Sequence, residues 1–92
     1  MLYYVTIELY LGEYEKTSCS FQEADSPERA EYNALFGETH NTDDAPSFDE
    51  YCEGTTEWWD DYMVYRLYSC VEILEPFASQ VREHSHIHVF EE

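Results

Sequence analysis

Near the start of the chain, residues Leu2 to Leu11 read LYYVTIELYL. The run is rich in β-branched and aromatic side chains, which favour strands. Apolar residues recur at every second position, as is typical of a strand that buries one face. That face carries Tyr3, Val5, Ile7, Leu9 and Leu11. Thr6 and Glu8 fall on the other face, so we predict a strand with one side against the core.

Two further runs extend the predicted sheet. After a turn at Gly12, residues Tyr14 to Gln22 (YEKTSCSFQ) continue as a more polar, peripheral strand, which predicts an opening β-hairpin. Residues Trp58 to Leu74 (WWDDYMVYRLYSCVEIL) alternate from Tyr62 onward, broken only by Ser69, and are predicted to form one continuous central strand. Its core face is expected to carry Met63, Tyr65, Leu67, Val71 and Ile73.

Two short helices are predicted between the hairpin and this central strand. Ser26-Pro27 is a helix start, because a serine oxygen accepts an unpaired backbone N–H and proline at the first helical position loses no intrahelical bond. We expect this helix to run from Pro27 to Phe36 and to close at Gly37. Ser47 and Glu50 have the spacing of a capping box, which predicts a second helix from Phe48.

A third helix is expected after Pro76, in EPFASQVREH, followed by a last strand from His86 to Phe90. The order β-β-α-α-β-α-β predicts an α+β fold. In it, a small antiparallel sheet of about four strands has short helices packed on one face. The chain of 92 residues is expected to form a single domain, residues 1–92.

Negative charge is the dominant feature of the composition. Twenty-one acids against four bases give a formal net charge of −17. Thirteen of those acids lie between Glu23 and Asp61, where Arg29 is the single base. Direct binding to nucleic acid or to an anionic membrane is therefore disfavoured, and a basic surface is the favoured partner.

Large apolar side chains are interleaved with these acids, which distinguishes the stretch from a disordered acidic tail. We therefore expect the carboxylates to be displayed on folded structure, where they pair with Lys and Arg of a partner while nearby aromatic rings pack against it. The candidate partner-binding residues are Glu28, Glu31, Asp43, Asp44, Asp49, Glu50, Tyr51, Glu53, Glu57, Trp58, Trp59, Asp60 and Asp61.

The run HSHIH near the C-terminal end offers an alternative chemistry. His84, His86 and His88, spaced at period two, would project from one face of a strand and could converge on a transition metal. The plainer interpretation is an exposed strand whose imidazoles offset part of the acidic field. We expect no metal and no cofactor.

Enzymatic signatures are missing from the sequence. It contains no GxxxxGK[ST], GxGxxG or GxSxG motif, and acid pairs such as Asp43-Asp44 arise from composition alone. Cys19, Cys52 and Cys70 form no CxxC pair and lack basic neighbours that would activate a thiol. We therefore predict a non-enzymatic protein with reduced thiols, located in the cytoplasm of a host cell and outside the membrane.

In size, charge and aromatic content the chain resembles the phage-encoded DNA-mimic inhibitors, which include anti-restriction, uracil-glycosylase-inhibitor and anti-CRISPR proteins. The resemblance covers the character of the whole chain and no sequence motif. It implies an inhibitor that occupies the nucleic-acid-binding groove of a host defence enzyme or complex.

Two alternatives stay open at this point. The first is an immunity protein or antitoxin that neutralises a basic nuclease, and the second is a small metal-binding domain built on HSHIH. A homodimer is also conceivable, because the polar run YEKTSCSFQ would leave a strand edge available to a second copy.

Overall fold

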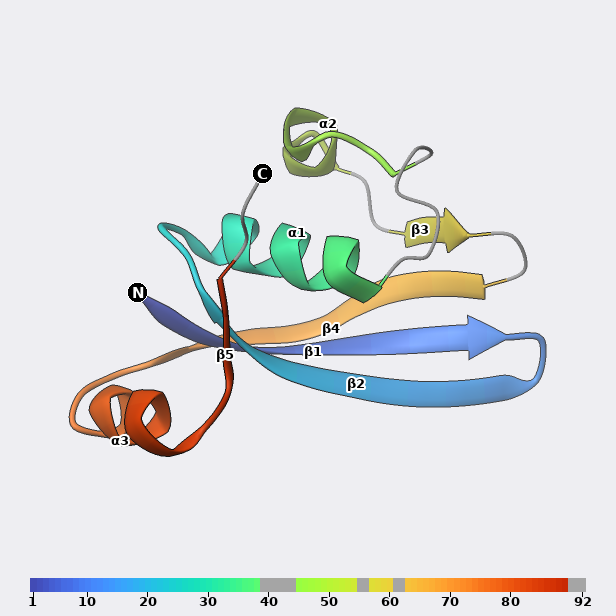
Figure 1. Cartoon of the computed structure of the whole chain (residues 1–92). Helices are drawn as coiled ribbons and strands as arrows, with labels where there is room; N and C mark the ends of the chain where they lie inside the picture. Colours follow the sequence, from blue (N-terminus) through green and yellow to red (C-terminus); the bar gives the residue numbers. More distant parts are fainter. Residues whose placement is uncertain (39–44, 55–56, 61–62, 90–92) are drawn as a thin grey trace.

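A five-stranded sheet forms the base of the protein, in a computed structural model that describes residues 1–38, 45–54, 57–60 and 63–89 (Figure 1). The strand order is β3-β4-β1-β2-β5. The strands are β1 (Leu2–Leu11), β2 (Tyr14–Glu23), β3 (Glu57–Asp60), β4 (Met63–Ile73) and β5 (Ile87–Val89). Four of them form an antiparallel arrangement, whereas β5 pairs in parallel with the end of β2.

The described residues also form three helices, α1 (Pro27–Glu38), α2 (Phe48–Cys52) and α3 (Phe77–His84). The predicted α+β fold with an antiparallel sheet and short helices is confirmed. Figure 1 shows α1 and α2 on one side of the sheet and α3 on the other. The expectation that all helices cover one face is therefore corrected. Leu2, which points away from α1, and Ala78 of α3 are both buried.

The predicted strand from Trp58 to Leu74 is in fact two antiparallel strands. Trp58 of β3 lies opposite Tyr65 of β4, and Asp60 lies opposite Met63. The period-two pattern holds only from Tyr62 onward, because Trp58-Trp59-Asp60-Asp61 is two apolar residues followed by two acids. That break in the alternation is the local sign of the reversal. The centre of the sheet is β1, which lies between β4 and β2.

A β-bulge in β4 also changes which side chains face the core. Thr6 of β1 pairs with Ser69 and the next residue, Ile7, pairs with Leu67, so Tyr68 is an extra residue on β4. An extra residue moves every later side chain to the opposite face. Cys70 therefore lies opposite the buried Val5, and Val71, predicted to face the core, is 54% exposed.

Local capping signals position the two helices above the sheet. The Ser26 hydroxyl oxygen accepts the backbone N–H of Arg29 at 3.2 Å, as predicted for the start of α1. That helix runs through Gly37 to Glu38, so the predicted stop at Gly37 is wrong. In α2 the capping box is formed: the Glu50 N–H donates to the Ser47 hydroxyl at 3.2 Å, and the Ser47 N–H donates to the Glu50 carboxylate at 3.1 Å.

The main core lies between α1 and the sheet. It contains the predicted β1 face, except Leu11, which is 44% exposed at the end of the strand. Tyr32 of α1 lies at the centre of an aromatic cluster. Its ring centroid is 5.3 Å from that of Trp58 and 5.5 Å from that of Phe48, and its hydroxyl donates to the Pro46 carbonyl at 2.9 Å. Rings in tilted and edge-to-face contact bury large areas and fix one another's orientation.

Candidate partner-binding surface

The short helix α2 separates its apolar and acidic residues onto opposite sides. Phe48 and Tyr51 are partly buried and pack against the core cluster. Asp49 and Glu50 are exposed, and so is Glu53, which caps the C-terminal end of the helix. A helix of five residues is not stable by itself in water, so these aromatic contacts and the capping box hold the carboxylates in place.

Two acids of α1 continue this surface toward the N-terminal end of that helix. Glu28 is exposed, and Glu31 is partly buried and accepts a hydrogen bond from the Tyr51 hydroxyl at 2.6 Å. The bond joins α1 to α2, so the acids of both helices lie on the same side of the sheet (Figure 1). Burial, and then the Glu31 carboxylate, raise the pKa of the Tyr51 phenol well above its ordinary value.

Arg29, the single base of the acidic stretch, is turned toward aromatic rings of the same domain. Its guanidinium carbon lies 4.8 Å from the Phe48 ring centroid and 5.5 Å from that of Tyr32. Cation–π contacts of this kind help to fix α2 on α1. The base therefore strengthens the scaffold beneath the carboxylates.

The aromatic candidates differ from their predicted role. Trp58 is only 2% exposed and contacts Tyr32, Phe36 and Tyr51, so it belongs to the core and is not available to a partner. Its indole N–H is buried without a hydrogen-bond acceptor among the described residues. The Tyr51 ring is likewise half-buried and its hydroxyl is engaged by Glu31. Both side chains stabilise the surface from beneath.

For the remaining candidate partner-binding residues, the structure describes the backbone alone or nothing at all. Asp43, Asp44 and Asp61 fall outside the described residues. For Glu57, Trp59 and Asp60 the backbone is described, as part of β3. The candidate acids that the structure places on α1 and at α2, on the same side of the sheet, are therefore Glu28, Glu31, Asp49, Glu50 and Glu53.

Two further acids join Glu28 near the start of α1, and the sequence did not single them out. The pKa of the Tyr3 phenol is raised by burial and then by the negative field of neighbours that include Glu72, Glu28 and Asp25. Glu72 reaches this side because of the bulge at Tyr68. The pairing of β4 with β1, which places the bulge, is not encoded in the local pattern.

The histidine run does not form the predicted array. His84 is the last residue of α3, and the chain turns through Ser85 and His86 before β5 begins at Ile87. The three histidines therefore do not share one strand face. Among the described residues, no group of three or more His, Cys, Asp or Glu side chains is arranged to hold a metal ion.

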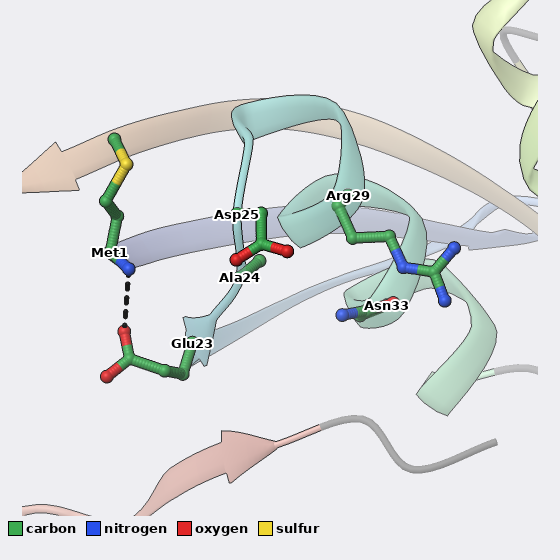
Figure 2. A pocket seen from close by; sticks show the side chains of 6 residues that line it. All are labelled: Met1, Glu23, Ala24, Asp25, Arg29 and Asn33. Atoms are coloured by element: carbon green, nitrogen blue, oxygen red, sulfur yellow. Dashed lines mark ion pairs between the residues drawn. The ribbon is translucent and has the colours of Figure 1, made fainter.

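A small polar pocket of about 230 Å³ lies beside the start of α1 (Figure 2). Glu23 stands at its edge, 3.3 Å from the α-amino group of Met1. Arg82 of α3 approaches the same carboxylate at 2.9 Å and lowers its pKa. The buried Asn33 lines the pocket, and its side-chain oxygen has no partner among the described residues. The ion pair between Arg82 and Glu23 connects α3 to the end of β2.

Comparison of the chain with protein-family models, curated proteins and solved structures finds no match. Within the described part of the chain, no helix is long and apolar enough to cross a membrane.

Proposed function

We propose that this protein is a stoichiometric inhibitor, encoded by a virus or mobile element, of a host defence system that binds nucleic acid. In this mechanism it is an acidic DNA mimic of the anti-CRISPR or anti-restriction type. It places carboxylates where phosphates would lie in a basic groove, and it does so without catalysis or a cofactor.

The observation that carries the proposal is the construction of α2. Its exposed acids Asp49, Glu50 and Glu53 stand over an aromatic cluster, and the nearby Arg29 contacts rings of the same cluster. Carboxylates held in fixed positions can pair with the guanidinium groups of a partner and lose little conformational entropy on binding. Acids on a disordered tail would lose much more.

Electrostatics supports the same function. A net charge of −17 produces a long-range field that speeds encounter with a basic surface. A groove evolved to displace counterions from DNA binds such a surface with strong salt dependence.

The test is capture of partners from a host-cell lysate on the immobilised protein, followed by elution with a salt gradient. We expect basic nucleic-acid-binding proteins to be retained at low salt and released as the salt rises, with identification by mass spectrometry. Recovery of no basic protein at low salt would contradict the proposal.

A further inference from the structure

The two halves of β4 have different surroundings. Residues 63–66 pair with β3 on the outer side, and Tyr68 forms the bulge. Beyond the bulge, from Ser69 to Ile73, the described part of the chain provides no strand on that side, while β1 pairs on the inner side. We call Ser69–Ile73 the free half of β4. An edge of this kind presents unpaired N–H and C=O groups to which another strand can add.

The side of this edge that faces α1 is acidic. Glu72 is exposed there, and the Cys70 thiol lies 3.8 Å from the backbone carbonyl of Pro27 at the start of α1. After burial, the largest causes of the raised pKa of Cys70 are the carboxylates of Glu31 and then Glu28. The field of the α1 acids therefore reaches the edge itself. Glu28 and Glu72 form no ion pair within the described residues.

The opposite side of the same edge is apolar. Val71 is 54% exposed and lies in register with Tyr4 of β1. Ile73, two residues further along, lies in register with Leu2 and is on the same side of the sheet as Val71. Leu74 and Phe77, which follow the strand, are 64% and 66% exposed. A strand added at this position would therefore meet carboxylates on one of its faces and apolar side chains on the other.

We propose that the free half of β4 binds an extended segment of a basic partner protein by strand addition. In that segment Lys or Arg alternates with apolar residues, so the basic side chains meet Glu28, Glu31 and Glu72 while the apolar ones pack on Val71 and Ile73. Main-chain hydrogen bonds supply the pairing, and the alternation supplies the specificity. This inference rests on the proposed function, because it names how the basic partner is held.

The same acids argue against a second copy as the occupant. Pairing of two such edges would bring Glu72 and the α1 carboxylates of one copy toward those of the other, and facing like charges destabilise a strand pair. Each copy carries a net charge of −17, which adds to the repulsion. A basic strand meets attraction at every one of these positions.

The test uses the full-length protein and a synthetic heptapeptide that alternates lysine and valine. Its control is a peptide of the same charge in which proline replaces the valines, since proline cannot donate to a strand ladder. Amide hydrogen exchange is followed by NMR at low ionic strength. We expect the alternating peptide, and not the control, to slow exchange within Ser69–Ile73. A second described edge, at Tyr14–Ser20 of β2, should remain unaffected.

Matched variants sharpen the result. Glu72→Lys should weaken binding of the alternating peptide by about fivefold. Glu15→Lys, which makes the same charge change on the β2 edge, should leave that binding within about twofold of wild type. Equal losses in the two variants would show a general charge effect and would overturn the strand-addition proposal.

Three other outcomes would also overturn it. If both peptides perturb only the helices and leave Ser69–Ile73 in fast exchange, the edge is not the site, although the acidic surface still binds bases. If the free protein sediments as a dimer with protected β4 amides, the occupant is a second copy. If neither peptide binds and the lysate yields no basic protein, the proposed function fails as well.

Discussion

The Tyr51 hydroxyl donates a 2.6 Å hydrogen bond to the Glu31 carboxylate, and this bond joins two helices through residues that lie 20 positions apart in sequence. Since α2 has only five residues, its orientation depends on such contacts. The position of the exposed acids on α2 is therefore a property of the aromatic layer beneath them.

Replacement Tyr51→Phe removes this bond and retains the ring. We expect a loss of about 1–2 kcal/mol in the free energy of unfolding, because a partly buried bond to a charged acceptor is lost. Urea denaturation followed by circular dichroism measures the change. Tyr14→Phe is the control, since Tyr14 is 62% exposed, and it should change stability by less than about 0.5 kcal/mol. Equal stability of wild type and Tyr51→Phe would show that the bond does not hold α2.

Trp58 is expected to act as a core residue and not as a partner contact. Trp58→Ala should reduce the free energy of unfolding by about 3–5 kcal/mol, because it leaves a large cavity beneath Tyr32. Tyr68→Ala removes a ring that is 69% exposed and should cost less than about 0.5 kcal/mol. Similar costs in the two variants would contradict the burial of Trp58.

The Cys70 thiol is expected to be unreactive. Burial, with a further contribution from Glu31 and Glu28, raises its pKa to about 11 from the ordinary 9.0. At pH 8 a shift of this size reduces the thiolate, the reactive form, by about a hundredfold. Iodoacetamide labelling followed by peptide mapping should therefore modify the exposed Cys19 and Cys52 long before Cys70. Labelling of all three at equal rates would contradict the geometry.

The ion pair between Glu23 and Arg82 should make the free energy of unfolding depend on pH. The hydrogen bond from Arg82 lowers the pKa of Glu23 below 4.5, so the folded state favours the carboxylate. The contribution is therefore present above about pH 4.5 and is lost as the pH falls through the lowered pKa. Because both side chains are partly exposed, we expect Glu23→Gln to cost only about 0.5–1 kcal/mol at pH 7.

Thermal melts of Glu23→Gln and wild type at pH 7 and at pH 3 measure this effect, and the difference between the two proteins should shrink at the lower pH. Glu13→Gln, in the exposed turn between β1 and β2, is the control and should lose no stability at either pH. A difference for Glu23→Gln that grows as the pH falls would contradict the assigned pairing.

Features set by near neighbours in sequence were predictable. Ser26 caps α1, Ser47 and Glu50 form the capping box of α2, and the alternation of β1 identifies its buried face. Each depends on residues within a few positions of one another. The α+β fold followed from the order of these elements.

Features set by pairing between distant segments were not predictable. The bulge at Tyr68 exists because β4 is matched against β1, and it places Val71 outside and Glu72 on the acidic side. The reversal between β3 and β4 pairs Trp58 with Tyr65, and its one local sign is that Trp58-Trp59-Asp60-Asp61 does not alternate. The burial of Trp58 depends on its contacts with Tyr32 and Phe36 of α1, which are distant in sequence, so the sequence left it a plausible partner contact. For the acids, the residue type was enough to predict their charge and the kind of partner they would bind. The side of the sheet on which they lie depends on how α1 and α2 pack.

The proposed function requires that the acids fixed on α2 occupy a groove made for nucleic acid. Asp49→Lys with Glu53→Lys changes two exposed acids of that surface and leaves the capping residue Glu50 intact. Glu13→Lys with Glu15→Lys makes the same change of net charge on the hairpin, away from the helices. The pair of variants therefore separates a located surface from total charge.

The most direct measurement is capture from a host-cell lysate on immobilised wild type and on both double variants, with elution by duplex DNA. The proposed function predicts that wild type and the hairpin variant retain the same basic nucleic-acid-binding proteins, that DNA displaces them, and that the α2 variant retains at least about tenfold less. Equal retention by the two variants, or bound proteins that DNA does not displace, would contradict it.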